Sequence, residues 1–114
     1  MVANGLTSDL IKVKQLEWGN HTEDWCSQME NEFDLILASA PIYLPECVES
    51  LFHSMSFFLK KNGDGKILMV NNSVRLDPEM PRIKGEILPK YKLLITSKER
   101  KDSYSILTLT SSQT

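Results

Sequence analysis

Two short stretches of the chain combine residue types that suit a binding site. Glu17, Trp18 and Gly19 place a carboxylate and a large aromatic ring beside a glycine, where a predicted strand opens into a loop. Ala38 and Ser39 give small side chains at the end of another predicted strand. Small residues let a ligand approach the backbone, and ligands of open α/β sheets bind outside the carboxyl ends of the strands. These five residues are the candidates for ligand binding.

Other kinds of active site find little support in the sequence. His21 and His53 are far apart and lack cysteines or carboxylates at metal-ligand spacing, so we expect them on the surface or on a helix face. No Ser/His/Asp or Cys/His arrangement can be assembled. Gly63 and Gly65 precede a predicted strand, so they indicate a turn and do not form a phosphate-binding loop. A protein that binds another kind of nucleotide would need such a loop.

Composition sets the broad class. The chain has 114 residues, enough for one core, and its 13 basic and 15 acidic residues give a net charge of -2. A nucleic-acid partner is not expected, because it would require a basic face. No segment approaches the roughly 20 apolar residues that span a bilayer, and no signal peptide is visible. We therefore expect a cytoplasmic protein with no membrane partner, in which Cys26 and Cys47 are free thiols.

The first half of the chain predicts two strands around a short helix. Apolar and lysine residues alternate over residues 10–16, which predicts a half-buried edge strand. Thr22 is a suitable N-cap for a helix that continues to Met29. Residues 33–39 form the central strand. Its run of Leu35, Ile36 and Leu37 lacks polar alternation and predicts a strand that is covered on both faces, as in a parallel sheet.

The second half predicts a crossover and a hairpin. Pro45 begins the clearest helix, which ends before Asn62 and Gly63, and residues 66–70 form the next strand. Six apolar residues share one face of that helix, whereas Ser54 falls outside it; the six are Val48, Leu51, Phe52, Met55, Phe58 and Leu59. Prolines in residues 73–90 predict a loop with at most a turn or two of helix. Residues 92–96 and 104–110 predict an antiparallel hairpin.

Three of these features together resemble a known family. They are the strand that ends in Leu16-Glu17-Trp18-Gly19, the run Phe33-Asp34-Leu35-Ile36-Leu37-Ala38-Ser39 leading to Tyr43, and the terminal hairpin. They resemble the C-terminal half of the seven-stranded S-adenosylmethionine-dependent methyltransferases, and more closely the small protein-lysine methyltransferases. The resemblance implies an α/β fold: a truncated, Rossmann-like mixed sheet of about five strands with a C-terminal antiparallel hairpin. Residues 1–114 would then be one methyltransferase-like domain without its N-terminal, cofactor-loop half.

The resemblance also implies roles for the matching residues. Glu17 stands where an acidic residue receives the adenine amino group of the cofactor, S-adenosyl-L-methionine, and a carboxylate can accept that hydrogen bond. Trp18 would pack near the adenine ring, with Gly19 in the same turn. Ala38 and Ser39 would line the cofactor. Tyr43 matches the tyrosine near the methyl-transfer channel and is the candidate catalytic residue, while Arg75 matches an arginine that often follows the fifth strand.

Two departures from the family pattern bear on activity. The aspartate at the end of the fourth strand is Ala40 here, and the first two strands with their Gly-rich loop are missing. In the family's sheet order, 3-2-1-4-5-7-6, these strands separate residues 10–16 from residues 33–39. Unpaired buried strand edges are costly. We therefore expect either direct pairing of these two strands or a homodimer that covers the edge.

Two functions stay open at this point. The first is part of an S-adenosylmethionine-dependent protein-lysine N-methyltransferase, which acts on a protein substrate and is poorly active as this chain alone. The second is a non-enzymatic pseudo-methyltransferase that binds a protein partner. Trp18 could equally be a packing residue, and Tyr43 could be structural, because its usual aspartate neighbour is replaced by Ala40.

Overall fold

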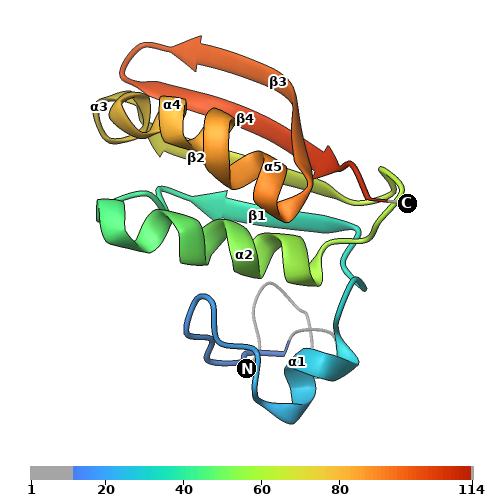
Figure 1. The fold of residues 1–114 in the computed structure, drawn as a ribbon. Helices are drawn as coiled ribbons and strands as arrows, with labels where there is room; N and C mark the ends of the chain where they lie inside the picture. Colours follow the sequence, from blue (N-terminus) through green and yellow to red (C-terminus); the bar gives the residue numbers. More distant parts are fainter. Residues whose placement is uncertain (1–11, 114) are drawn as a thin grey trace, which may run out of the picture.

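The computed structural model describes residues 12–113, which form a mixed sheet with helices packed against it (Figure 1). The strand order is β1-β2-β4-β3. The strands are β1 Leu35–Ser39, β2 Lys66–Asn72, β3 Leu93–Lys101 and β4 Tyr104–Ser111. β1 and β2 are parallel, whereas β4 is antiparallel to both of its neighbours. This order agrees with the last four positions of the order 4-5-7-6 that the resemblance implies, so the crossover and the terminal hairpin are confirmed.

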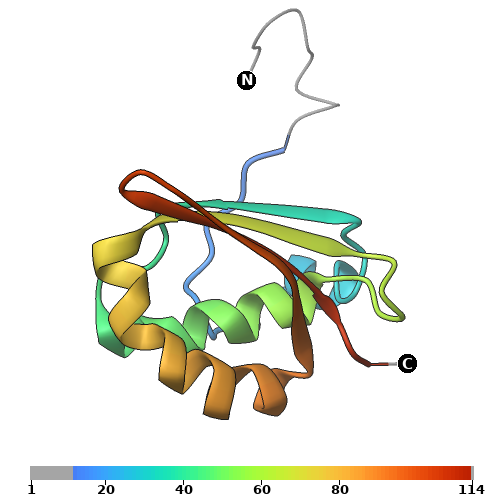
Figure 2. The same ribbon diagram turned by 90° about the horizontal axis from the view of Figure 1, so that it is seen from above.

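The helices lie on one face of this sheet (Figure 2). The longest is α2, Val48–Phe58, which follows a short turn, η1 Pro45–Cys47, and connects β1 to β2. The core lies between the helices and the sheet, and includes Phe52, Ile67, Met69, Leu107 and Leu109. Ser54 is only 3% exposed, so our placement of it outside the packed face of α2 is wrong. No helix of residues 12–113 lies on the opposite face of the sheet.

β1 is less covered than the sequence predicts. Ile36 and Ala38 pack against the core, but Leu35 is 53% exposed and Leu37 is 69% exposed. Alternate side chains of a strand point to opposite faces, so the second pair lies on the face without helices. The expectation of a strand covered on both faces is therefore wrong for the described residues.

The segment before β1 also differs from the prediction. Residues 12–16 are not in a strand and do not pair with β1, and residues 10 and 11 lie outside the described part of the chain. The sheet of the described residues has four strands, not about five. A strand needs a hydrogen-bonded neighbour, and alternation alone does not supply one. The helix α1, Asp24–Gln28, is shorter than predicted, since Glu23 and not Thr22 occupies its N-cap.

Residues 73–91 form a nearly continuous helical run in place of the predicted loop. Its segments are α3 Ser73–Leu76, η2 Asp77–Glu79, α4 Met80–Arg82, the π-helical turn η3 Ile83–Ile87 and α5 Leu88–Tyr91. The three prolines, Pro78, Pro81 and Pro89, stand at the first positions of η2, α4 and α5. Proline is tolerated there because those positions need no helical N–H bond.

Two smaller predictions can be compared directly. Cys26 and Cys47 are free thiols, as predicted. The helices found among residues 12–113 are too short or too polar to cross a membrane.

Candidate functional site

A cavity of about 520 Å³ lies between the chain around Trp18, the end of β1 and α2. This volume is within the range of about 300–1,000 Å³ that is common for small-molecule sites. Trp18, Ala38 and Ser39 all line it, so the structure brings together three of the five predicted binding residues. The other lining residues are Leu16, Phe33, Ile36, Leu37, Ala40, Pro41, Leu51, Ser54, Met55 and Phe58. None of these residues is titratable, which suits binding of an apolar or aromatic group more than acid–base chemistry.

The turn that carries Trp18 is attached to α2 through Ser54. The Gly19 N–H donates a hydrogen bond to Ser54 Oγ at 2.8 Å, and His21 Nε2 lies 2.9 Å from the same oxygen. Gly19 has φ +85, a conformation that favours glycine. A Cβ at this position would also lie 3.3 Å from Ser50 Cβ. Gly19 therefore positions Trp18 and does not itself line the cavity.

Aromatic packing holds the same segment against α2. The His21 ring stacks on Phe57 at 4.1 Å between centroids and meets His53 edge-on at 4.8 Å. Burial lowers the pKa of His21, and the nearby His53 lowers it further, while Glu30 opposes the shift. His21 thus packs as a half-buried neutral ring, which corrects the expectation of a surface histidine. His53 is on α2, as expected for a helix-face residue.

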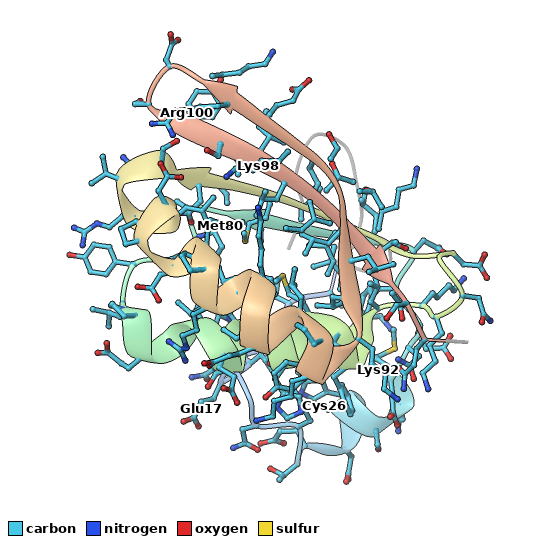
Figure 3. All side chains as sticks on the ribbon, turned by 45° about the horizontal axis from the view of Figure 1, so that its top comes forward. Glu17, Cys26, Met80, Lys92, Lys98 and Arg100 are labelled. Carbon is cyan, nitrogen blue, oxygen red and sulfur yellow. The ribbon has the colours of Figure 1, made fainter. Side chains whose placement is uncertain are left out.

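Glu17 is outside the cavity. It lines a smaller hollow of about 280 Å³ together with Leu16 and Asn20. Its backbone C=O accepts a hydrogen bond from the Asn20 N–H at 3.0 Å, which closes the turn. Figure 3 places Glu17 at the opposite side of the molecule from Lys98 and Arg100 of the β3–β4 hairpin. Its exposed carboxylate is free to accept a hydrogen bond at the rim of the site, since Leu16 lines both hollows.

The chain leaves β1 through a bend that a buried asparagine fixes. Ala40 has φ +49, and its N–H donates to the Val70 C=O at 2.6 Å. Asn71, only 2% exposed, accepts the Ile42 N–H at 2.8 Å and donates to the Ile42 C=O at 3.2 Å. These bonds satisfy buried backbone groups that the end of the strand would otherwise leave unpaired. The bend holds Ala40 and Pro41 in the cavity wall.

Tyr43 does not line the cavity. It is 63% exposed and lies under the Arg75 guanidinium, which is 4.6 Å from the centre of its ring. Both residues border a separate hollow of about 150 Å³, along with Val74 and Glu79. Tyr43 and Arg75 are therefore near each other, as the resemblance implies, but on the far side of the bend from Trp18.

Two residues that position the site are missing from the candidates named above. Ser54 accepts the Gly19 N–H, and Asn71 holds the bend after β1. For Ser54 the available signal is its spacing, because Leu51, Ser54, Met55 and Phe58 lie three or four residues apart on one helix face. For Asn71 the signal is an amide at the end of a buried strand, next to the carboxyl end of β1.

Comparison with known proteins places the chain in a family. The family model described as lysine methyltransferase matches residues 1–79. None of the curated proteins matches the chain. Among solved structures, PH0226 protein from Pyrococcus horikoshii OT3 has a TM-score of 0.51 at 19% identity over 73% of this chain and 53% of its own. The mitomycin 7-O-methyltransferase MmcR has a TM-score of 0.53 at 12% identity over 78% of this chain and 32% of its own.

A ribosomal protein L11 methylase from Lactobacillus delbrueckii subsp. bulgaricus is also similar, with a TM-score of 0.49 and 23% identity over 68% of this chain and 36% of its own. The chain thus spans little more than half, or less, of each of these structures. The α/β, Rossmann-like fold agrees with these neighbours. The match over residues 1–79 covers more than half of the sequence. The chain belongs to the lysine methyltransferase family.

Proposed function

We propose that this chain forms part of an S-adenosylmethionine-dependent protein-lysine N-methyltransferase, with the cavity beside Trp18 as the place of the adenosine portion. The observation that carries the proposal is that Trp18 and the pair Ala38–Ser39 line one cavity in a chain that matches the family model. The cavity lies at the carboxyl end of β1, where ligands of open α/β sheets bind.

The residues present fit the adenosine portion of the cofactor. Trp18 offers an aromatic face to the adenine ring, and Glu17 at the rim can accept a hydrogen bond from the adenine amino group. Ala38 and Ser39 leave space for the ligand beside the strand. For the amino-acid end of the cofactor, the cavity offers no charged side chain among residues 12–113.

In the proposed reaction the chain's role is to bind and orient. When bound, S-adenosylmethionine supplies the methyl group that a target lysine amine takes from the sulfonium sulfur. Such transfer depends largely on positioning the two reactants in line. Ala40 has no carboxylate to interact with the amine, and Tyr43 faces Arg75 outside the cavity. The chain alone is therefore proposed to bind the cofactor weakly and to transfer methyl groups poorly.

A second candidate function is a pseudo-methyltransferase that binds a protein partner without catalysis. Ala40 favours it, since the position that carries an aspartate in the family pattern holds an inert methyl group here. This candidate predicts no saturable binding of S-adenosylmethionine.

Isothermal titration of the 114-residue chain with S-adenosylmethionine tests the first proposal. We expect saturable binding that Trp18→Ala weakens by about tenfold, because stacking on an aromatic ring contributes on the order of 1 kcal/mol or more. Tyr104→Ala is the matched control, since Tyr104 and Trp18 are both 39% exposed and Tyr104 does not line the cavity.

Adenosine as a second ligand sharpens this experiment. Because the cavity offers no charged side chain for the amino-acid end, adenosine should bind within about threefold of S-adenosylmethionine, a difference below 1 kcal/mol. No heat of binding with either ligand, from a folded chain, would reject the first proposal and favour the second.

A further inference from the structure

The outer edge of β1 has backbone groups that no residue of 12–113 pairs. The Lys66 N–H donates to the Asp34 C=O at 2.8 Å, and the Ala40 N–H donates to the Val70 C=O at 2.6 Å. Backbone groups of successive strand residues point to alternate sides, so the even-numbered residues of β1 face β2. The N–H and C=O groups of Leu35, Leu37 and Ser39 therefore point outward, away from the described sheet.

The other edge of the sheet is protected, whereas this one is not. β3 has an irregular register between Ile95 and Ser97, and it continues as Lys98-Glu99-Arg100-Lys101. A bulge and charged residues are the usual means of preventing edge-to-edge pairing. β1 is Leu-Ile-Leu-Ala-Ser, with a regular register and no charge. Its edge has the properties of a strand that pairs with another strand.

The exposed face beside this edge is apolar as well. Leu35 and Leu37 are 53% and 69% exposed, and Leu68, the β2 partner of Leu37, is 37% exposed. Adjacent apolar side chains on a sheet are favourable to cover, because their burial stabilises by about 25 cal/mol per Å². Pairing at the edge would bring a second apolar strand beside these leucines.

We propose that the occupant of this edge is a second copy of the chain, paired antiparallel through β1 about a two-fold axis at Leu37. In this register Leu35 of one copy lies opposite Ser39 of the other, and Leu37 lies opposite itself. Residues whose backbone groups point outward then meet each other, so every outward N–H finds an outward C=O. Such a pairing is isologous and closed, as in most homodimers.

The side chains are compatible with this register. Residues directly opposite each other share a face, so the exposed leucines of both copies form one apolar surface. Asp34, the nearest charged residue before β1, would lie opposite Ala40 of the second copy, and therefore like charges do not meet. The strand thus fulfils the requirements of its own partner.

The second copy would also complete the candidate site. Side chains of Leu37 and Ala38 point to opposite faces of β1, yet both line the cavity, so the cavity runs along the open edge. A strand added at that edge would form a wall of the cavity. The pairing itself does not depend on the cofactor, so its test is separate from the test of the proposed function.

Amide hydrogen exchange at low and high protein concentration tests the pairing in the unmodified chain. We expect the amides of Leu35, Leu37 and Ser39 to exchange fast in the dilute protein and slowly in the concentrated protein. Ile36 and Ala38, which face β2, should exchange slowly at both. Sedimentation should show twice the mass of one chain at the high concentration.

Charge variants at the two-fold axis provide a second test. Leu37→Lys places two lysines opposite each other, so we expect dimerisation to weaken by about tenfold or more. Leu37→Glu should have the same effect, and a mixture of the two variants should dimerise again. Val74→Lys is the control: Val74 is 76% exposed on α3, away from β1, and this variant should dimerise as the original chain does.

Three results would overturn the proposal. They are a monomer at every concentration, protection of the outward amides that does not depend on concentration, and dimers that survive Leu37→Lys. The second of these would mean that the chain covers this edge itself. If the charge variants fail to fold, the exchange pattern of the unmodified chain still decides the matter.

Discussion

Gly19 sets the conformation of the turn that presents Trp18. Its φ of +85 and the approach of Ser50 Cβ to 3.3 Å from a built Cβ both disfavour any larger residue. We expect Gly19→Ala to lower the free energy of unfolding by about 1–2 kcal/mol, since left-handed backbone is unfavourable for alanine. Urea denaturation measures this change.

Gly85 is the matched control for that substitution. No atom lies within 4 Å of a Cβ built there, and the residue is in the helical turn η3. Gly85→Ala should raise the free energy of unfolding by about 0.5–1 kcal/mol, because alanine is the better helix former. Equal effects of the two substitutions would contradict the conformational role of Gly19.

His21 links the stability of the same turn to pH. Its folded-state pKa is lowered from 6.5, mainly because burial disfavours the charged ring. Near that pH the unfolded chain binds more protons than the folded chain, so the folded state loses stability as pH falls below about 6.5. We expect the free energy of unfolding to drop between about pH 7.5 and pH 5.5, and His21→Gln to reduce this drop. An unchanged slope in the variant would count against a neutral, packed His21.

At the residue scale, sequence and structure agree in part on the site. The resemblance groups Trp18 with Ala38 and Ser39, and the structure places these residues around one cavity. It does not predict that Ser54 and Asn71 position them, because both bonds join residues far apart in the chain. Such contacts depend on how α2 and β2 pack, and periodicity alone does not give that.

At the scale of elements, the two faces of β1 and its neighbours differ in energy. Leu37 is 69% exposed, whereas Leu107 on β4 is fully buried. Leu107→Ala should cost about 2–5 kcal/mol through lost burial and a cavity. Leu37→Ala should cost less than about 1 kcal/mol when unfolding is measured in dilute protein, where the proposed dimer does not contribute. Similar losses for both would show that the exposed face of β1 is covered within one chain.

The helical run from Ser73 to Tyr91 shows why some elements escape sequence analysis. Leu76, Met80, Ile83 and Ile87 recur at helical spacing, and all four are buried. The prolines in this region led to a predicted loop, but each one begins a new short segment where its missing N–H has no consequence. By contrast, the β3–β4 hairpin could be predicted, because its strands are adjacent in sequence.

The segment at residues 12–16 illustrates the opposite error. Its alternating pattern predicts a strand, yet a strand requires a neighbour with a free edge. Within the described residues β1 has that edge, but Leu16 and Trp18 line the cavity beside it instead of pairing with it. Local pattern therefore predicts the tendency of a segment, whereas the partner strand decides the outcome.

At the scale of the whole molecule, the described chain has the helices of one sheet face and an unpaired strand edge. Both features agree with its length, since it spans between 32% and 53% of the similar solved structures. The proposed cofactor site and the proposed dimer meet at this edge. A cavity with an open side should bind its ligand more weakly than an enclosed one, because less of the ligand surface is buried.

The measurement that tests the central proposal most directly is an NMR titration of the 114-residue chain with S-adenosylmethionine. The account predicts that the backbone amides of Gly19, Ala38 and Ser39 shift and saturate together, while that of Tyr104, on β4, stays in place. Saturable shifts confined to other parts of the chain, or none in a folded sample, would contradict the assignment of this cavity to the cofactor.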